Sequence, residues 1–225
     1  MMKAHVPRRT AIAAGLLLAP PALSRPPLDR PNIVVILLDD AGYGDFTHSG
    51  HPVIRTPNIS RLATEGATFT QFYSGAPACT ASRYALLTGR SPARSGLAGW
   101  AIGPEAKRYI HPREVTLAEG LKARGYATGI FGKWHLGTPN AANGFTPLAL
   151  PLAQGFDEWY GTNVSHDYPD AALIEGPAPG DAPSKGYHTI ATNLPSNTAL
   201  CRTLTRTTTD RAIDFLDQHL AGKEQ

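Results

Sequence analysis

Apolar and polar positions along this chain alternate between strand-like and helix-like patterns. Residues 32–38 are almost all apolar and rich in Ile and Val, which is typical of a parallel strand buried on both faces. A shorter apolar run at 127–131 predicts the next strand. From Thr208 to Leu220 the apolar residues recur at helical spacing, which predicts an amphipathic helix before Gly222. This alternation predicts an α/β fold with a mostly parallel sheet.

Helix-start signals add two shorter helices to this pattern. Asn58 is a suitable cap for a helix over 59–65 that Gly66 would close. Thr116 and Glu119 have the spacing of a capping box, and that helix is expected to end at Gly125. Residues 139–200 are rich in Pro, Gly and Asn and are predicted to be mainly loop.

Composition excludes several classes of protein. The chain has 225 residues, of which 42% are hydrophobic and two are Cys, which fits one domain or two small ones and excludes a disulfide-dense scaffold. The longest apolar run, 11–23, is interrupted by two prolines and is too short for stable membrane insertion. Of 21 basic residues three lie in 1–24, so the remaining 18 balance the 18 acids, and no basic face for nucleic acid is predicted.

The first 24 residues are predicted to be an export signal peptide. Basic residues precede an apolar stretch, and residues 22–24 offer small side chains for cleavage. The pair Arg8-Arg9 fits a twin-arginine signal, and the alternative is an ordinary secretory signal. A Pro-rich spacer at 25–31 would separate this leader from a domain at 32–225. Export from a bacterium would make the protein periplasmic or extracellular.

Three short motifs carry candidate chemistry. Asp39 and Asp40 follow the predicted strand at the sheet edge where α/β proteins bind ligands, and adjacent carboxylates favour a hard divalent cation. Gly42 and Gly44 would allow a sharp turn beside them. The alternative is a solvated acidic turn.

The second motif begins at Cys79. Residues 80–88 have helical potential, so Cys79 is expected at a helix N-terminus, where backbone N–H groups favour an anion. Arg83 lies one turn further along and can reach the same anion. The alternative is a structural Cys, or a disulfide with Cys201.

The third motif places Lys133 and His135 two residues apart after the strand at 127–131. Such residues face the same side of an extended segment, and a cation beside an imidazole suits an oxyanion. The alternative is a surface Lys and a His at the edge of the core.

Together these motifs resemble the sulfatase family of the alkaline-phosphatase-like superfamily, in particular its arylsulfatase-A-like members. Residues 79–90 (CTASRYALLTGR) resemble the first family signature, and 125–137 (GYATGIFGKWHLG) the second. Residues 39–45 (DDAGYGD) resemble the N-terminal metal motif, and 155–161 with 165–167 a following segment. The resemblance runs from about residue 32 to the C-terminus and implies an alkaline-phosphatase-like mostly parallel sheet flanked by helices.

The resemblance implies a sulfuric ester hydrolase and a role for each matching residue. Cys79 would be converted to formylglycine by a maturation enzyme, and its hydrate would be the nucleophile. Arg83 would stabilise that hydrate, and His135 would hydrogen-bond it and help to expel sulfate. Lys133 and Ser165 would bind the substrate, a small-molecule or carbohydrate sulfate ester. A divalent cation, Ca²⁺ or alternatively Mg²⁺, would be held by Asp39, Asp40 and the residue at position 79.

Two departures from the family pattern affect these expectations. Position 81 is Ala where the commonest signature has Pro, which bears on which maturation enzyme acts. Family members also extend well beyond residue 225 and take an Asp-Asn metal pair, a His and a second Lys from that part, so a truncated catalytic domain with little activity alone is expected. His188 and His219 match no motif. Two alternatives remain: a phosphate or phosphonate ester hydrolase of the same superfamily, or a non-catalytic truncated product.

Overall fold

The computed structural model describes residues 30–99, 101–103, 109–137, 147–169, 171–177 and 186–221. They divide into two compact units, one ending at Ala41 and the other beginning at Gly42, and each is described by itself. The predicted signal peptide and all but the last two residues of the predicted spacer lie outside the described residues.

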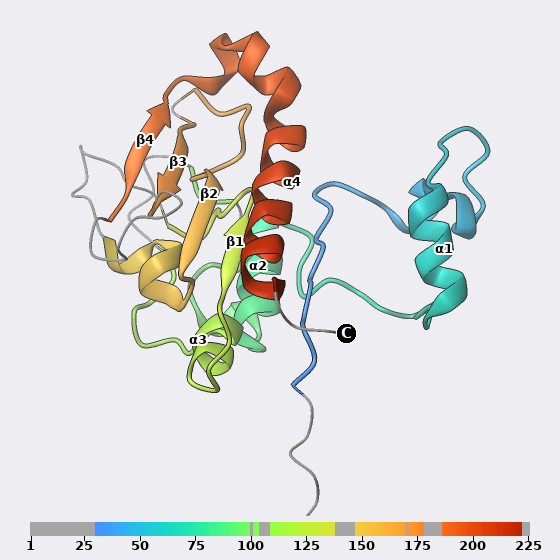
Figure 1. Ribbon diagram of the computed structural model, residues 1–225, viewed down its shortest axis with the longest axis horizontal. Helices are drawn as coiled ribbons and strands as arrows, with labels where there is room; N and C mark the ends of the chain where they lie inside the picture. The colour runs from blue at the N-terminus through green and yellow to red at the C-terminus, as the bar shows by residue number, and fades with distance from the viewer. Residues whose placement is uncertain are drawn as a thin grey trace, which may run out of the picture. The chain divides into compact units, whose positions relative to one another are not determined.

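A short mixed sheet organises the second unit (Figure 1). Its strands lie side by side in chain order: β1 (Gly129–Phe131), β2 (Glu158–Thr162), β3 (Leu173–Gly176) and β4 (His188–Ala191). β1 and β2 are parallel, whereas β2–β3 and β3–β4 are antiparallel. The α/β class is thus confirmed, with a mixed sheet in the described residues in place of the mostly parallel one expected.

Three of these strands fall in the region 139–200 that was predicted to be mainly loop. The sequence pattern did not indicate them because they have only four or five residues each. β2 and β3 are almost completely buried, so they lack the alternation of polar and apolar residues that identifies a half-exposed strand. They are strands because neighbouring strands of the sheet pair with them, and no local sequence pattern indicates them.

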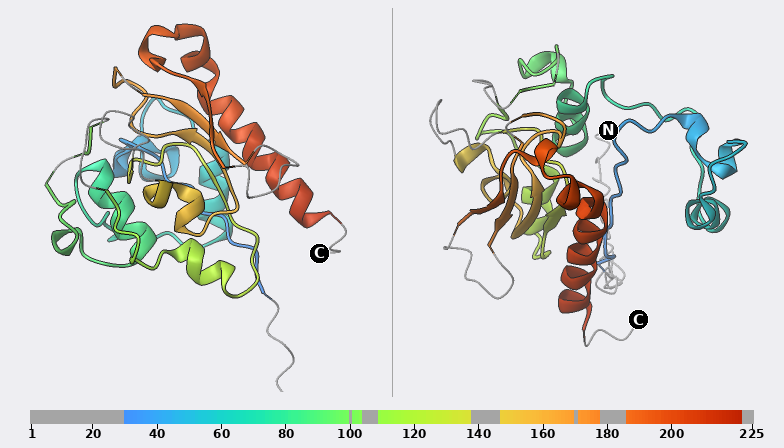
Figure 2. Two further views of the ribbon diagram at one scale, coloured as in Figure 1. Left: turned by 90° about the vertical axis from the view of Figure 1, so that its left-hand side faces the viewer. Right: turned by 90° about the horizontal axis from the view of Figure 1, so that it is seen from above.

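Side chains alternate between the two faces of this sheet. One face, with Ile130, Trp159 and Ile174, joins a core that includes Tyr84 of α2 (Cys79–Thr88) and Ala118 of α3 (Leu117–Lys122). The other face, with Phe131, Tyr160 and Leu173, packs against Leu200 and Leu204 of α4 (Thr198–Leu220). Figure 2 shows the sheet between α4 and the segment that carries α2 and α3.

Each predicted helix is present, but its ends are shifted. α1 (Pro57–Glu65) begins two residues before the predicted start, because Pro is favoured in the first helical turn, and Gly66 ends it as expected. α3 has the predicted capping box, but the α-helix ends at Lys122, and tighter turn hydrogen bonds carry the chain to Gly125. α4 begins at Thr198, well before the predicted Thr208, with the Asn197 side chain accepting from the Leu200 N–H at 3.1 Å.

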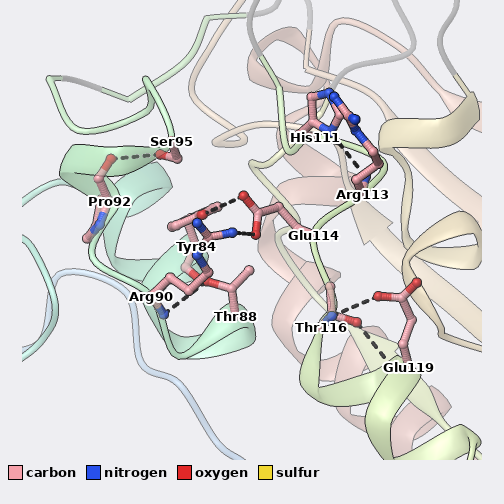
Figure 3. Close-up of polar contacts among 10 residues, drawn as sticks. All are labelled: Tyr84, Thr88, Arg90, Pro92, Ser95, His111, Arg113, Glu114, Thr116 and Glu119. Carbon is pink, nitrogen blue, oxygen red and sulfur yellow. Dashed lines mark hydrogen bonds and ion pairs between the residues drawn. The ribbon is translucent and has the colours of Figure 1, made fainter.

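Glu114 fastens α2 to the segment that leads into α3 (Figure 3). One carboxylate oxygen accepts a 2.8 Å hydrogen bond from the Tyr84 hydroxyl, and the other pairs with Arg90. Burial, and next the bond to Glu114, raise the pKa of Tyr84. Thr116 and Glu119 form the reciprocal capping bonds close by. The helix that begins with Cys79 is therefore held at both its body and its end.

The apolar run 32–38 is not a strand in this structure. Its residues have no regular secondary structure, and the side chains of Ile33 to Leu38 are 45–74% exposed. The apolar run indicates a segment suited to burial, but a strand also needs neighbouring strands to bond with, and the described residues supply none for it. No helix among the described residues has the length and apolar composition needed to cross a bilayer.

Candidate active site

Cys79 is the first residue of α2, as predicted. Ala78 before it has extended backbone, and Gly89 ends the helix in the left-handed conformation with φ of 65°. The Cys79 thiol is half-buried and forms no disulfide. Cys201, the alternative partner, donates instead to the Leu194 carbonyl at 3.1 Å. The thiol at the helix start is therefore available to other groups.

The segment after β1 delivers His135 to this thiol. Its backbone continues along β2, with the Trp134 and His135 N–H groups donating to Thr162 and Asn163 carbonyls at 2.8 and 3.0 Å. The Trp134 side chain is buried and donates to the Ala149 carbonyl at 2.9 Å. His135 then adopts φ of 59°, a left-handed conformation that is unfavourable for a residue with a side chain. Packing and hydrogen bonds on both sides hold it there.

Cys79 and His135, which are 56 residues apart in sequence, are in contact. The thiol Sγ lies 3.2 Å from His135 Nδ1, and His135 Nε2 lies 2.6 Å from the Ile102 carbonyl oxygen. Because a carbonyl oxygen only accepts, Nε2 carries the ring proton. In the neutral ring Nδ1 therefore presents its lone pair to residue 79, which is the arrangement of a base beside a nucleophile.

The two predicted basic residues lie next to this pair. The Arg83 guanidinium donates from Nη1 to the Lys133 carbonyl at 2.6 Å, which ties α2 to the segment carrying His135. Both side chains are half-buried. A basic residue one turn after Cys79 and another two residues before His135 thus accompany the helix N-terminus, a combination that suits a tetrahedral oxyanion.

The loop after β2 completes the cluster with Ser165, which the family resemblance selected, and with Tyr168, which it did not. A hydrogen bond from Ser165 lowers the pKa of Asp167, and the charges of His166 and Lys133 lower it further, although partial burial opposes them. The ring of Tyr168 meets the His135 imidazole edge-on, with 5.7 Å between centroids. Burial, then the charges of Cys79 and Asp167, raise the pKa of Tyr168. The Ser165-His166-Asp167 string pointed to this loop, but no local pattern indicated Tyr168.

Asp39 and Asp40 belong to the other compact unit, so the structure does not place them relative to Cys79. Both are exposed. The chain turns at Asp40, with φ of 56°, and neither Gly42 nor Gly44 takes the left-handed conformation that was expected to make the turn. Adjacent carboxylates have the donor chemistry of a hard cation. Within the described residues, however, no three His, Cys, Asp or Glu side chains gather to complete a metal site.

His188 and His219, which match no motif, have structural partners. His188 Nε2 lies 3.2 Å from a carboxylate oxygen of the buried Glu175, and His219 Nδ1 lies 2.8 Å from the Phe215 carbonyl within α4. Neither contact involves the residues around Cys79.

Fold and site together define an α/β protein with a cysteine, a histidine and two basic residues gathered beyond the end of β1. A family model described as Sulfatase matches residues 31–225, and the chain belongs to this family. It is 48% identical to human arylsulfatase A over 158 residues, which cover 70% of this chain and 28% of that protein.

Two solved structures extend the comparison to the fold. The PsFucS1 sulfatase from Pseudoalteromonas sp. aligns with a TM-score of 0.62 and 30% identity, over 81% of this chain and 39% of that one. A structure described as a complex with its substrate D-glucosamine-2-N,6-O-disulfate aligns with a TM-score of 0.58 and 26% identity, over 87% and 32%. The chain thus spans about a third of the length of these relatives.

Proposed function

We propose that this chain carries the nucleophile half of a sulfuric ester hydrolase of the arylsulfatase type. The observation that carries the proposal is the 3.2 Å contact between Cys79 Sγ and a His135 Nδ1 that faces it with its lone pair. A thiol, or a hydroxyl formed at position 79, would find there a group able to accept its proton.

The surrounding side chains suit the charge of a sulfate ester. Lys133 would bind the sulfate oxygens, and Arg83 would orient the group at position 79 while its Nη1 bonds to the Lys133 carbonyl. Ser165, which bonds to Asp167, would hydrogen-bond the substrate. Each group is held by backbone or a neighbouring side chain before the substrate arrives, which is the condition for electrostatic catalysis.

Two components of the site would be added after translation: the formylglycine at position 79 and a divalent cation. Maturation of Cys79 by a formylglycine-generating enzyme would supply a geminal diol, which can attack sulfur and later release sulfate by returning to the aldehyde. Asp39 and Asp40 would hold a divalent cation, Ca²⁺ or Mg²⁺, beside position 79, because hard carboxylate oxygens suit either ion. Such a cation would lower the pKa of a hydroxyl next to it.

The relatives indicate the substrate class, and residues 1–24 indicate the location of the protein. One solved relative holds a sulfated glucosamine and another relative is an arylsulfatase, so we infer that a carbohydrate or aryl sulfate ester is the substrate. The basic and apolar leader in residues 1–24 would export the chain to the periplasm or beyond.

The maturation step is tested by mass mapping of the protein isolated from its source. Trypsin releases the peptide Leu62 to Arg83, which contains Cys79. We expect formylglycine in this peptide. An unmodified Cys79 throughout the preparation would contradict the proposed nucleophile.

The reaction class is tested by comparing aryl sulfate and aryl phosphate turnover under identical conditions. We expect sulfate to be preferred and Cys79→Ala to abolish turnover. Cys201→Ala is the matched control, because Cys201 lies on α4 and contacts the Leu194 carbonyl, away from His135. Equal rates for Cys79→Ala and Cys201→Ala would reject Cys79 as nucleophile, and a preference for phosphate would identify the other ester class.

A further inference from the structure

Thr80, the residue after the proposed nucleophile, connects three segments through one hydroxyl group. Thr80 is fully buried. Its Oγ1 donates to the His135 carbonyl at 3.0 Å and accepts from the Ile102 N–H at 3.0 Å. One hydroxyl has a single proton to donate and lone pairs to accept with, so both bonds form at once.

The same Ile102 also binds the imidazole of His135. Its carbonyl oxygen lies 2.6 Å from Nε2, so Thr80, Ile102 and His135 form a closed cycle of three hydrogen bonds. In this cycle the His135 carbonyl bonds to Thr80, the His135 Nε2 bonds to Ile102, and Thr80 bonds to Ile102. These three residues form a buried frame around His135. The remaining ring nitrogen, Nδ1, is left pointing at Cys79.

This frame matters because the backbone of His135 is strained. With φ of 59°, a non-glycine residue persists only where its surroundings hold it. Removing the Thr80 hydroxyl breaks two bonds of the cycle at once, one to the carbonyl of His135 and one to the Ile102 segment. The Ile102 carbonyl would then no longer be held against Nε2.

We propose that Thr80 is a positioning residue for His135: its hydroxyl keeps the ring proton on Nε2, bonded to Ile102, and thereby turns the Nδ1 lone pair to residue 79. The catalytic meaning of this placement rests on the proposed function, whereas the placement itself can be measured without substrate.

The test is NMR of the full chain with ¹⁵N-labelled histidine, at a pH where the imidazole is neutral. In the wild type we expect a His135 ring proton on Nε2 that exchanges slowly with water, identified by its absence in His135→Gln. Thr80→Val, which replaces the hydroxyl with a methyl group, should lose this slow exchange. Thr80→Ser, which keeps the hydroxyl, should retain it.

Thr116→Val separates positioning from general stability. Thr116 is also buried, and its hydroxyl likewise donates to a carbonyl, that of Gln154 at 2.6 Å, and accepts from an N–H, that of Glu119 at 3.1 Å. The Thr116→Val variant should be destabilised like Thr80→Val but keep the protected ring proton of His135. Protection that survives in Thr80→Val would overturn the proposal. Should Thr80→Val not fold, the wild type decides, because a ring proton on Nδ1 would overturn the proposal equally.

Turnover gives a second readout that distinguishes this proposal from the proposed function. If the wild type hydrolyses a chromogenic aryl sulfate, Thr80→Val should lower kcat at least about tenfold with KM unchanged. Rates are taken per formylglycine-bearing molecule by mass spectrometry, since position 80 adjoins the modified residue. An unmodified Cys79 in the protein from its source, together with the expected ring proton, rejects the proposed function and leaves the positioning intact. An unchanged kcat in Thr80→Val overturns the positioning role.

Discussion

The segment around His135 and the segment from residue 32 to Asp40 differ in exposed fraction and in hydrogen-bond partners. Trp134, His135 and Leu136 are at most 1% exposed, and their backbone bonds to Thr162, Asn163 and Ile110. Ile33 to Leu38 are 45–74% exposed and have no strand partner in the described residues. The first segment is held by its neighbours, and the second has no regular secondary structure.

This difference shows that an apolar pattern and a set of partners are separate requirements. Residues 32–38 are the more hydrophobic of the two segments, yet the segment with a Lys, a Trp and a His in a row is the more deeply buried. Burial becomes stabilising only where another element supplies the covering surface and the hydrogen bonds. Substitutions in the two segments should therefore differ widely in their effect on the free energy of unfolding.

The largest effect is expected at Gly161, where β2 passes the segment after β1. A Cβ there would lie 1.7 Å from the Gly132 carbonyl oxygen, so Gly161→Ala has to push the two backbones apart. We expect a loss of about 4 kcal/mol or more in urea denaturation. Gly120→Ala is the control: its Cβ meets nothing within 4 Å, and Ala favours the helix. Similar stability of the two variants would contradict the close approach at Gly161.

A smaller loss is expected for Trp134→Phe, which removes the bond from Nε1 to the Ala149 carbonyl at 2.9 Å. The unpaired carbonyl and the lost volume should cost about 2 kcal/mol. Trp159→Phe removes the same atoms from an equally buried residue, but its Nε1 lies 3.4 Å from the Gly132 carbonyl. Denaturant midpoints should fall further for Trp134→Phe, and the reverse order would mean that the Ala149 bond does not hold this segment.

Asp157 provides a pH-dependent test of the links that hold β1 and β2. Burial raises the pKa of Asp157, but the bonds from Lys122 at 2.7 Å and from the Thr128 N–H and hydroxyl outweigh it, so its pKa lies below the ordinary value. The folded state therefore favours the carboxylate. Its stabilising effect is complete above the pKa of the unfolded chain, near 4, and is lost as the pH falls through the lower folded pKa.

Asp157→Asn should accordingly destabilise the chain by less than about 1 kcal/mol at neutral pH, and the difference from wild type should vanish in acid. Stability measured between neutral and acidic pH checks this. Asp210→Asn, in an exposed pair with Arg206 at 4.0 Å, should differ little from wild type throughout. A difference for Asp157→Asn that grows in acid would contradict the sign.

The smallest effect is expected for Ile36→Ala, because Ile36 is 74% exposed. We expect a change within about 0.5 kcal/mol, against about 2–5 kcal/mol for the fully buried Ile110→Ala. Thermal denaturation of the two variants compares them directly. Equal losses would mean that the run 32–38 is buried in the protein in solution, and the contrast between the two segments would disappear.

Local signals in the sequence determined the starts of α2 and α3, the α/β class and the motif residues. A capping box such as Thr116 with Glu119 spans one helical turn, and Cys79 precedes a stretch of good helix formers closed by Gly89, so these features need only neighbours along the chain. The motif strings likewise identified the family, which the match over 31–225 confirmed.

Only the tertiary structure decided which residues meet at the site and how they are held. β2 and β3 are strands because of their partners, and the run 32–38 has none in the described residues. The contact of Cys79 with His135, the left-handed backbone of His135 and the cycle through Thr80 and Ile102 join residues that lie 22 to 56 positions apart. Such contacts depend on packing between elements, which no pattern within one helical turn or one strand encodes.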